Sequence, residues 1–138
     1  MNMAKLHNAV QQYNQVGVVS SVESASPHRL IQMLMAGALE KIAIAKGYME
    51  RQEISQKGSH ISWAISIIDG LRASLNLDAG GEIAQNLDDL YDYMTRRLAR
   101  ANVENNTDLL DEVASLLRTI KGAWDDIPED INQIANKS

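Results

Sequence analysis

The stretch EIAQNLDDLYDYMTRRLARA, residues 82–101, decides the fold class. Its apolar residues recur at spacings of three and four, which places them on one face of an α-helix: they are Ile83, Leu87, Leu90, Met94, Leu98 and Ala101. Acids come early in the stretch and arginines come late, as the helix dipole favours: they are Glu82, Asp88 and Asp89, then Arg96, Arg97 and Arg100. We therefore predict a helix from Glu82 to about Ala101.

Three further stretches have the same periodicity. One begins at Ser26-Pro27, because serine caps a helix and proline suits its first position, and it continues to Met49. Another spans about 57–75, and the last spans about 108–124, after a turn at residues 105–107. Paired glycines predict a turn over residues 77–81. Short connections between long helices predict an all-α protein, an antiparallel four-helix bundle.

The expected organisation is one helical bundle, residues 26–127, between two less ordered ends. Residues 1–25 form a mobile N-terminal segment, in which residues 5–13 are either a short cap helix or a frayed terminus. Residues 128–138 form a flexible tail.

The composition excludes several classes of protein. A chain of 138 residues corresponds to one domain, and without cysteine it has neither a disulfide nor a thiolate metal site. Its net charge of -5 disfavours a nucleic-acid partner. No stretch approaches the roughly 20 apolar residues of a membrane helix, and none resembles a signal-peptide core. We therefore expect no membrane insertion and a cytoplasmic location.

The sequence predicts no catalytic residue, no metal site and no cofactor, so we expect that the chain is not an enzyme. None of the histidines, His7, His28 and His60, has a glutamate three residues before it, as inward-facing di-metal sites require, so each is expected on the surface. The acids of the third helix are expected on a solvated face, with Asp92 paired to Arg96. The nearby arginines either complement the helix dipole or contact an anionic partner.

The informative feature is a surplus of apolar residues beyond one stripe per helix. Trp63 and Ile67 form a second line beside the stripe of their helix, and Ala84, Tyr91 and Leu98 lie seven residues apart on the next helix. Two explanations remain open at this point. The surplus either widens the core, with Trp63 under the N-terminal segment, or forms a groove for an amphipathic partner helix.

Several stretches resemble the flagellar export chaperones of the FliS family. They are Tyr13–Val16, Ser24–Ala38 with Ser26-Pro27-His28-Arg29-Leu30, Ala64–Leu75, Gly80–Leu87 and Leu90–Leu98, and a helix that ends in Trp124 completes the pattern. The resemblance covers residues 10–127. One departure lies on the first helix, where relatives often have an aromatic residue and an acid before Gly37-Ala38, and this chain has Met35 and Ala36.

The resemblance implies a function. Members of the family form antiparallel helical bundles, bind the disordered C-terminal segment of flagellin in the cytoplasm, prevent its premature polymerisation and escort it to the flagellar type III export gate. The N-terminal segment can occupy part of the client surface when flagellin is absent. A tyrosine near the N-terminus is linked to contact with the export gate protein, and Tyr13 matches it. The expected flagellin-binding residues are Trp63, Ile67, Ile68, Leu71, Leu75, Ile83, Ala84, Leu87, Tyr91, Met94 and Leu98.

One alternative function stays open from the residues. A small regulatory bundle that sequesters a transcriptional or signalling partner would have the same apolar surplus. The oligomeric state is open as well, because a wide apolar face serves a homodimer as well as a monomer with a client.

Overall fold

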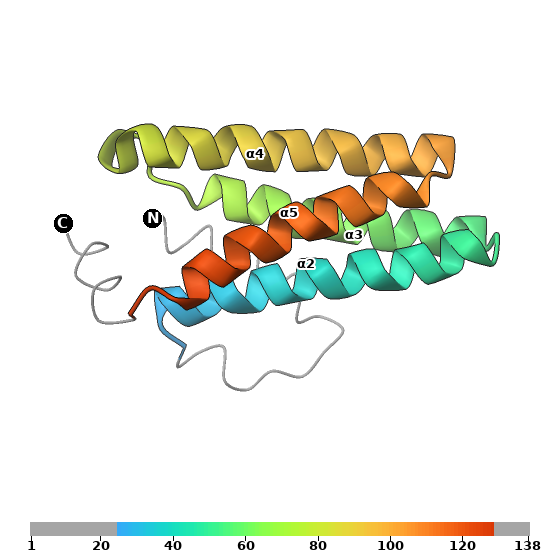
Figure 1. The fold of residues 1–138 in the computed structure, drawn as a ribbon, viewed down its shortest axis with the longest axis horizontal. Helices are drawn as coiled ribbons and strands as arrows, with labels where there is room; N and C mark the ends of the chain where they lie inside the picture. Colours follow the sequence, from blue (N-terminus) through green and yellow to red (C-terminus); the bar gives the residue numbers. More distant parts are fainter. Residues whose placement is uncertain (1–24, 129–138) are drawn as a thin grey trace.

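Four α-helices run through residues 25–128, the part of the chain that the computed structural model describes. They are labelled as in Figure 1: α2 (Pro27–Glu50), α3 (Ile54–Ala73), α4 (Leu77–Glu104) and α5 (Thr107–Asp125). Consecutive helices run in opposite directions, so the predicted antiparallel bundle is confirmed. The expectations for the N-terminal segment, including Tyr13, and for the tail beyond Pro128 lie outside the described residues.

The helix starts follow from capping side chains. Ser26 Oγ accepts a hydrogen bond from Arg29 N (3.2 Å), and Pro27 follows it at the first helical position, as predicted. Asn76 Oδ1 caps α4 through Ala79 N (3.0 Å), and Asn106 Oδ1 caps α5 through Asp108 N (2.9 Å). These caps satisfy backbone N–H groups that have no partner inside the helix.

Two predicted boundaries are wrong. α3 begins at Ile54, three residues before the prediction, because residues 54–56 are exposed and only Ile54 among them is apolar, so no apolar pattern marks this turn. The turn expected over residues 77–81 is instead the first part of α4. Only Gly81 leaves the helical conformation, with φ 58° and ψ -137°. The asparagine cap explains the difference, since it starts the helix before the glycines.

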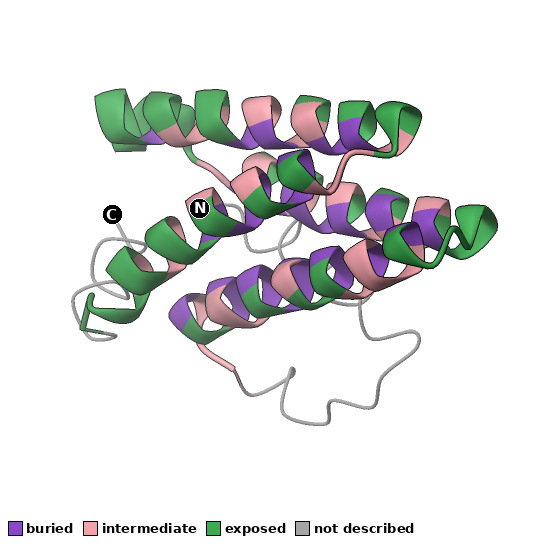
Figure 2. Cartoon of the chain, turned by 45° about the vertical axis from the view of Figure 1, so that its right-hand side comes forward, coloured by how far each residue is buried: buried purple, intermediate pink, exposed green. Residues whose placement is uncertain are grey.

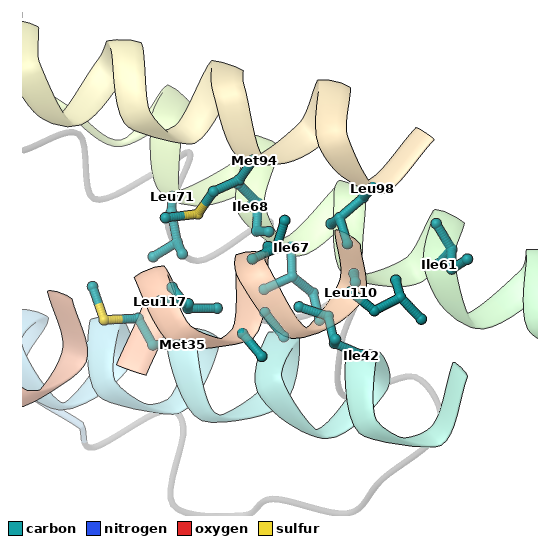
Figure 3. Close-up of a cluster of buried hydrophobic side chains, with 14 of the residues drawn as sticks. Met35, Ile42, Ile61, Ile67, Ile68, Leu71, Met94, Leu98, Leu110 and Leu117 are labelled. Carbon is teal, nitrogen blue, oxygen red and sulfur yellow. The ribbon is translucent and has the colours of Figure 1, made fainter. Parts of the chain in front are cut away.

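The core lies between the four helices. Figure 3 shows Ile67 and Ile68 of α3, Met94 and Leu98 of α4, and Leu110 of α5 pointing into one cluster. Most of the residues predicted as core are buried there, as the periodicity indicated. The cluster also contains Tyr91, which the sequence left open between core and partner surface.

The path of α5 positions the candidate site. Near its N-terminus, α5 is joined to the C-terminal half of α4, where Tyr93 and Arg97 both bond to Glu112. Near its C-terminus it is joined to α2, where Trp124 Nε1 donates to the His28 carbonyl oxygen at 3.0 Å. Figures 1 and 2 both show α5 running obliquely between these two neighbours. The N-terminal half of α4 is therefore left without α5 beside it.

Candidate functional site: an apolar groove between α4 and α5

A small apolar pocket lies where α4 and α5 separate. Its volume is about 40 Å³, enough for the tip of one side chain but not for a helix. All four helices or the turns after them contribute to its lining: Ile31, Met35, Leu71, Ser74, Leu75, Leu87, Tyr91, Ile120 and Trp124. Several of these side chains are only half-buried, so the pocket reaches the surface. It offers an apolar side chain from outside a place to enter.

Apolar surface continues from the pocket along α4. Ile83 and Leu90 lie four and three residues from Leu87, so the three share one side of the helix. Ile83 is 75% exposed and Leu90 is 36% exposed. Residues 77–83, at this end of α4, are all exposed, and Figure 2 shows this end of the helix in green. We call the pocket together with Ile83 and Leu90 the α4–α5 groove.

A polar cluster closes the other end of the groove. Arg97 Nε donates to Glu112 Oε1 at 2.9 Å, and Tyr93 Oη donates to Glu112 Oε2. The hydrogen bond from Tyr93, then that from Arg97, lowers the pKa of Glu112 below its ordinary value. The cluster ties the two helices together where the groove ends.

A second polar cluster fixes α4 to α3. Arg72 donates to Asp88 (2.7 Å) and to Asp92 (3.0 Å). The predicted pair between Asp92 and Arg96 is confirmed at 3.0 Å. Arg97 and Arg100 also pair with acids, so each arginine of this predicted cluster contacts a carboxylate of the chain itself. These contacts orient α4 so that its apolar stripes face the core and the groove.

The residues predicted to bind flagellin divide into three groups by exposure. Ile83 is exposed, and Trp63, Leu75 and Leu87 are half-buried. The others are buried in the described structure: they are Ile67, Ile68, Leu71, Ala84, Tyr91, Met94 and Leu98. Leu71, Leu75, Leu87 and Tyr91 come together in the pocket. Any contact of the buried residues with a client outside the pocket would require the helices to move.

Trp63 lies away from this groove, on the side of α3 that faces α2. Lys41 Nζ lies 3.8 Å from the centre of its ring, and His60 and Tyr48 continue the row of rings. A cation over an indole face is a favourable contact. Trp63 therefore belongs to a second, half-buried surface between α2 and α3.

Sequence reasoning misassigned three residues at the groove. His28 was expected on the surface, but it is 5% exposed and stacks on Trp124 with 5.1 Å between ring centres. Trp124 and Ile120 were assigned to the core, whereas both are half-buried and line the pocket. The position of Trp124 in the last turn of its helix was the available signal, because a helix end seldom seals a core completely.

Comparison with known proteins identifies the family. Residues 9–130 match the family described as flagellar protein FliS. The chain is 54% identical over 119 residues to flagellar secretion chaperone FliSB of Pseudomonas aeruginosa, covering 86% of this chain and 94% of that protein. It is 47% identical over 121 residues to flagellar secretion chaperone FliS of Salmonella typhimurium, covering 87% and 90%. The chain belongs to the FliS family.

Another FliS relative extends the match along the chain. Flagellar secretion chaperone FliS of Vibrio cholerae is 41% identical over 129 residues, covering 94% of this chain and 95% of the relative. The matched region includes all four described helices and so the whole groove. The resemblance seen in the sequence motifs is thereby confirmed.

Two further features of this FliS chain complete the survey. A wider pocket of about 460 Å³ at the opposite end of the bundle surrounds Lys57, whose ammonium donates to Asn102 O (3.0 Å) and Asn105 Oδ1 (3.2 Å), so this lysine has a structural role. Within residues 25–128, no group of three His, Asp or Glu side chains could hold a metal ion. No helix in that range is long and apolar enough to cross a membrane.

Proposed function

We propose that this chain is a cytoplasmic export chaperone for flagellin. It binds the disordered C-terminal segment of flagellin, prevents premature polymerisation and delivers the client to the flagellar type III export gate. Membership of a family whose relatives are named flagellar secretion chaperones supports the proposal. The observation that carries it is the α4–α5 groove, an apolar pocket that opens to the surface beside exposed apolar residues of α4.

The energetics require a long client contact. Ordering ten residues of a disordered chain costs about 10–20 kcal/mol, which burial of about 400–800 Å² of apolar surface offsets. The pocket alone is too small for that. The client therefore lays apolar side chains along Ile83, Leu87 and Leu90, and continues over further half-buried surface such as that around Trp63.

Ile83→Asp tests the groove, because the side chain is exposed and its loss leaves the core intact. We expect affinity for a synthetic peptide of the flagellin C-terminal segment to fall about tenfold or more, since burying an isoleucine contributes about 1.5–3 kcal/mol. The helical circular dichroism spectrum should not change.

Val103→Asp is the matched control. Val103 is 86% exposed, lies on the same helix and is far from the groove, so this variant should bind the peptide like the unmodified chain. Equal affinity of the Ile83 and Val103 variants would contradict the assignment of the groove.

We propose that Tyr13 contacts the export gate protein when the chaperone delivers flagellin. We expect Tyr13→Ala to leave peptide binding nearly unchanged and to weaken docking of the chaperone–flagellin complex to the purified export gate protein. If mutant and unmodified complexes docked with equal affinity, the role of Tyr13 would be withdrawn.

A further inference from the structure

One stripe of α4 carries acids beside the groove. Glu82, Asn86, Asp89 and Tyr93 recur at spacings of four and three, so they lie on one side of the helix. Each of these residues directly precedes a member of the apolar stripe that begins at Ile83. Tyr93 shows which way this side of α4 faces, since its hydroxyl donates a hydrogen bond to Glu112 of α5. The acids therefore border the groove on its outer edge.

Glu82 and Asp89 differ from three other acids of α4. Asp88, Asp92 and Glu104 each lie within ion-pair distance of an arginine. Glu82 and Asp89 are exposed, and among residues 25–128 neither has a cation within ion-pair distance. The hydrogen bond recorded for Asp89 comes from the neutral side chain of Gln85, at 3.1 Å. Two negative charges thus border the apolar surface without a basic side chain.

The helix dipole explains only one of them. Glu82 lies in the turn that follows Gly81, where a negative charge near a helix start is favourable. Asp89 lies about two turns further along, where the dipole effect has fallen off.

The wall of the groove that α5 forms, opposite α4, supplies no cation either. After Glu112, the side of α5 that faces α4 carries Leu116, Thr119, Ile120 and Ala123. None of these four residues is basic. The negative edge of the groove is therefore not balanced from across it.

We propose that the α4–α5 groove is specific for an amphipathic helix with Lys or Arg directly beside its apolar stripe. The apolar stripe packs on Ile83, Leu87 and Leu90, and the basic side chains lie over Glu82 and Asp89. This inference rests on the proposed function and adds the charge pattern of the client. Charges at the edge of an interface act mainly on the association rate and on its salt dependence, so those quantities report on the proposal.

The test compares two double variants with the same change in net charge. Glu82→Gln with Asp89→Asn neutralises the edge of the groove. Glu50→Gln with Asp108→Asn neutralises two exposed acids at the opposite end of the bundle. Association of the flagellin C-terminal peptide is measured by stopped flow over a range of ionic strength, for each variant and for the unmodified chain. A second peptide has glutamine at every Lys and Arg.

At low ionic strength, we expect the groove variant to associate about threefold to tenfold more slowly than the control variant, with a weaker salt dependence. The neutralised peptide should not distinguish the two variants. Equal rates for both variants with the native peptide would overturn the inference and leave the proposed function standing. No binding of the native peptide to the unmodified chain would overturn both.

Discussion

Tyr91 is the residue at which packing most clearly changes chemistry. It is 3% exposed, and burial raises the pKa of its phenol to about 12. The ordinary pKa of a tyrosine phenol is 10.0, so the unfolded chain loses this proton more easily. Tyr91 therefore contributes stability that is fully present below pH 10 and is lost as the pH rises towards 12.

Tyr91→Phe tests this link between burial and stability. Between pH 10 and pH 12, the phenol should account for a loss of up to about 2–3 kcal/mol in the free energy of unfolding. The phenylalanine variant lacks the ionising group, so its stability should fall less steeply over that range in urea unfolding. Tyr48→Phe, at a half-buried tyrosine, is the control. Parallel curves for the Tyr91 variant and the unmodified chain would contradict the burial.

Neighbours of Tyr91 on α4 show that a helical pattern does not predict how deeply each residue is buried. Spacing placed Leu87 and Met94 on one face of α4, but Met94 is fully buried and Leu87 is only half-buried. The difference comes from α5, which is tied to α4 beside Tyr93 and then departs from it. Residue spacing describes one helix at a time. It therefore predicts which face of the helix is apolar, but not which neighbouring helix covers that face.

At the scale of elements, Gly81 allows α4 to start where it does. Its φ of 58° lies in the region that residues other than glycine rarely adopt, and it joins the turn capped by Asn76 to the rest of the helix. At Gly80, a Cβ atom would come within 2.5 Å of Ala84 Cβ. The two glycines therefore have different roles, one in conformation and one in close approach.

Gly81→Ala should lower the free energy of unfolding by about 1–3 kcal/mol, because the alanine must either adopt a strained conformation or shift the start of α4. Gly122→Ala is the matched control, since nothing lies within 4 Å of its added methyl group and it sits inside α5. The control should be neutral or slightly stabilising. Urea unfolding measures both, and an unchanged stability of the Gly81 variant would show that this kink is not needed.

Helix existence was easier to predict than helix ends. The cap at Ser26 carries a local signal and was predicted correctly, and the turn predicted over residues 105–107 contains the cap of α5, Asn106. The start of α3 at Ile54 was not, because its first turn has no apolar face. The glycine pair hid the helical turn that Asn76 caps. Glycines that permit a positive φ occur both in a turn before a helix and within the first turns of a helix, so the sequence alone does not distinguish the two.

At the scale of the molecule, the bundle was predictable and its opening was not. Periodicity and short connections determine four antiparallel helices. The oblique path of α5 depends on contacts distant in the sequence, such as that from Trp124 to the His28 carbonyl and that from Gln32 to Asp125. Those contacts leave the N-terminal half of α4 exposed, and with it the groove that the proposed function uses.

The central claim is that this apolar surface binds and orders the C-terminal segment of flagellin. Titration calorimetry of that peptide into the full chain, with circular dichroism on the same mixture, tests it most directly. We predict one-to-one binding of micromolar affinity or tighter, a negative heat-capacity change and a gain in helicity. Neither heat nor added helicity, both with the full folded chain and with a folded chain that lacks residues 1–20, would contradict the account.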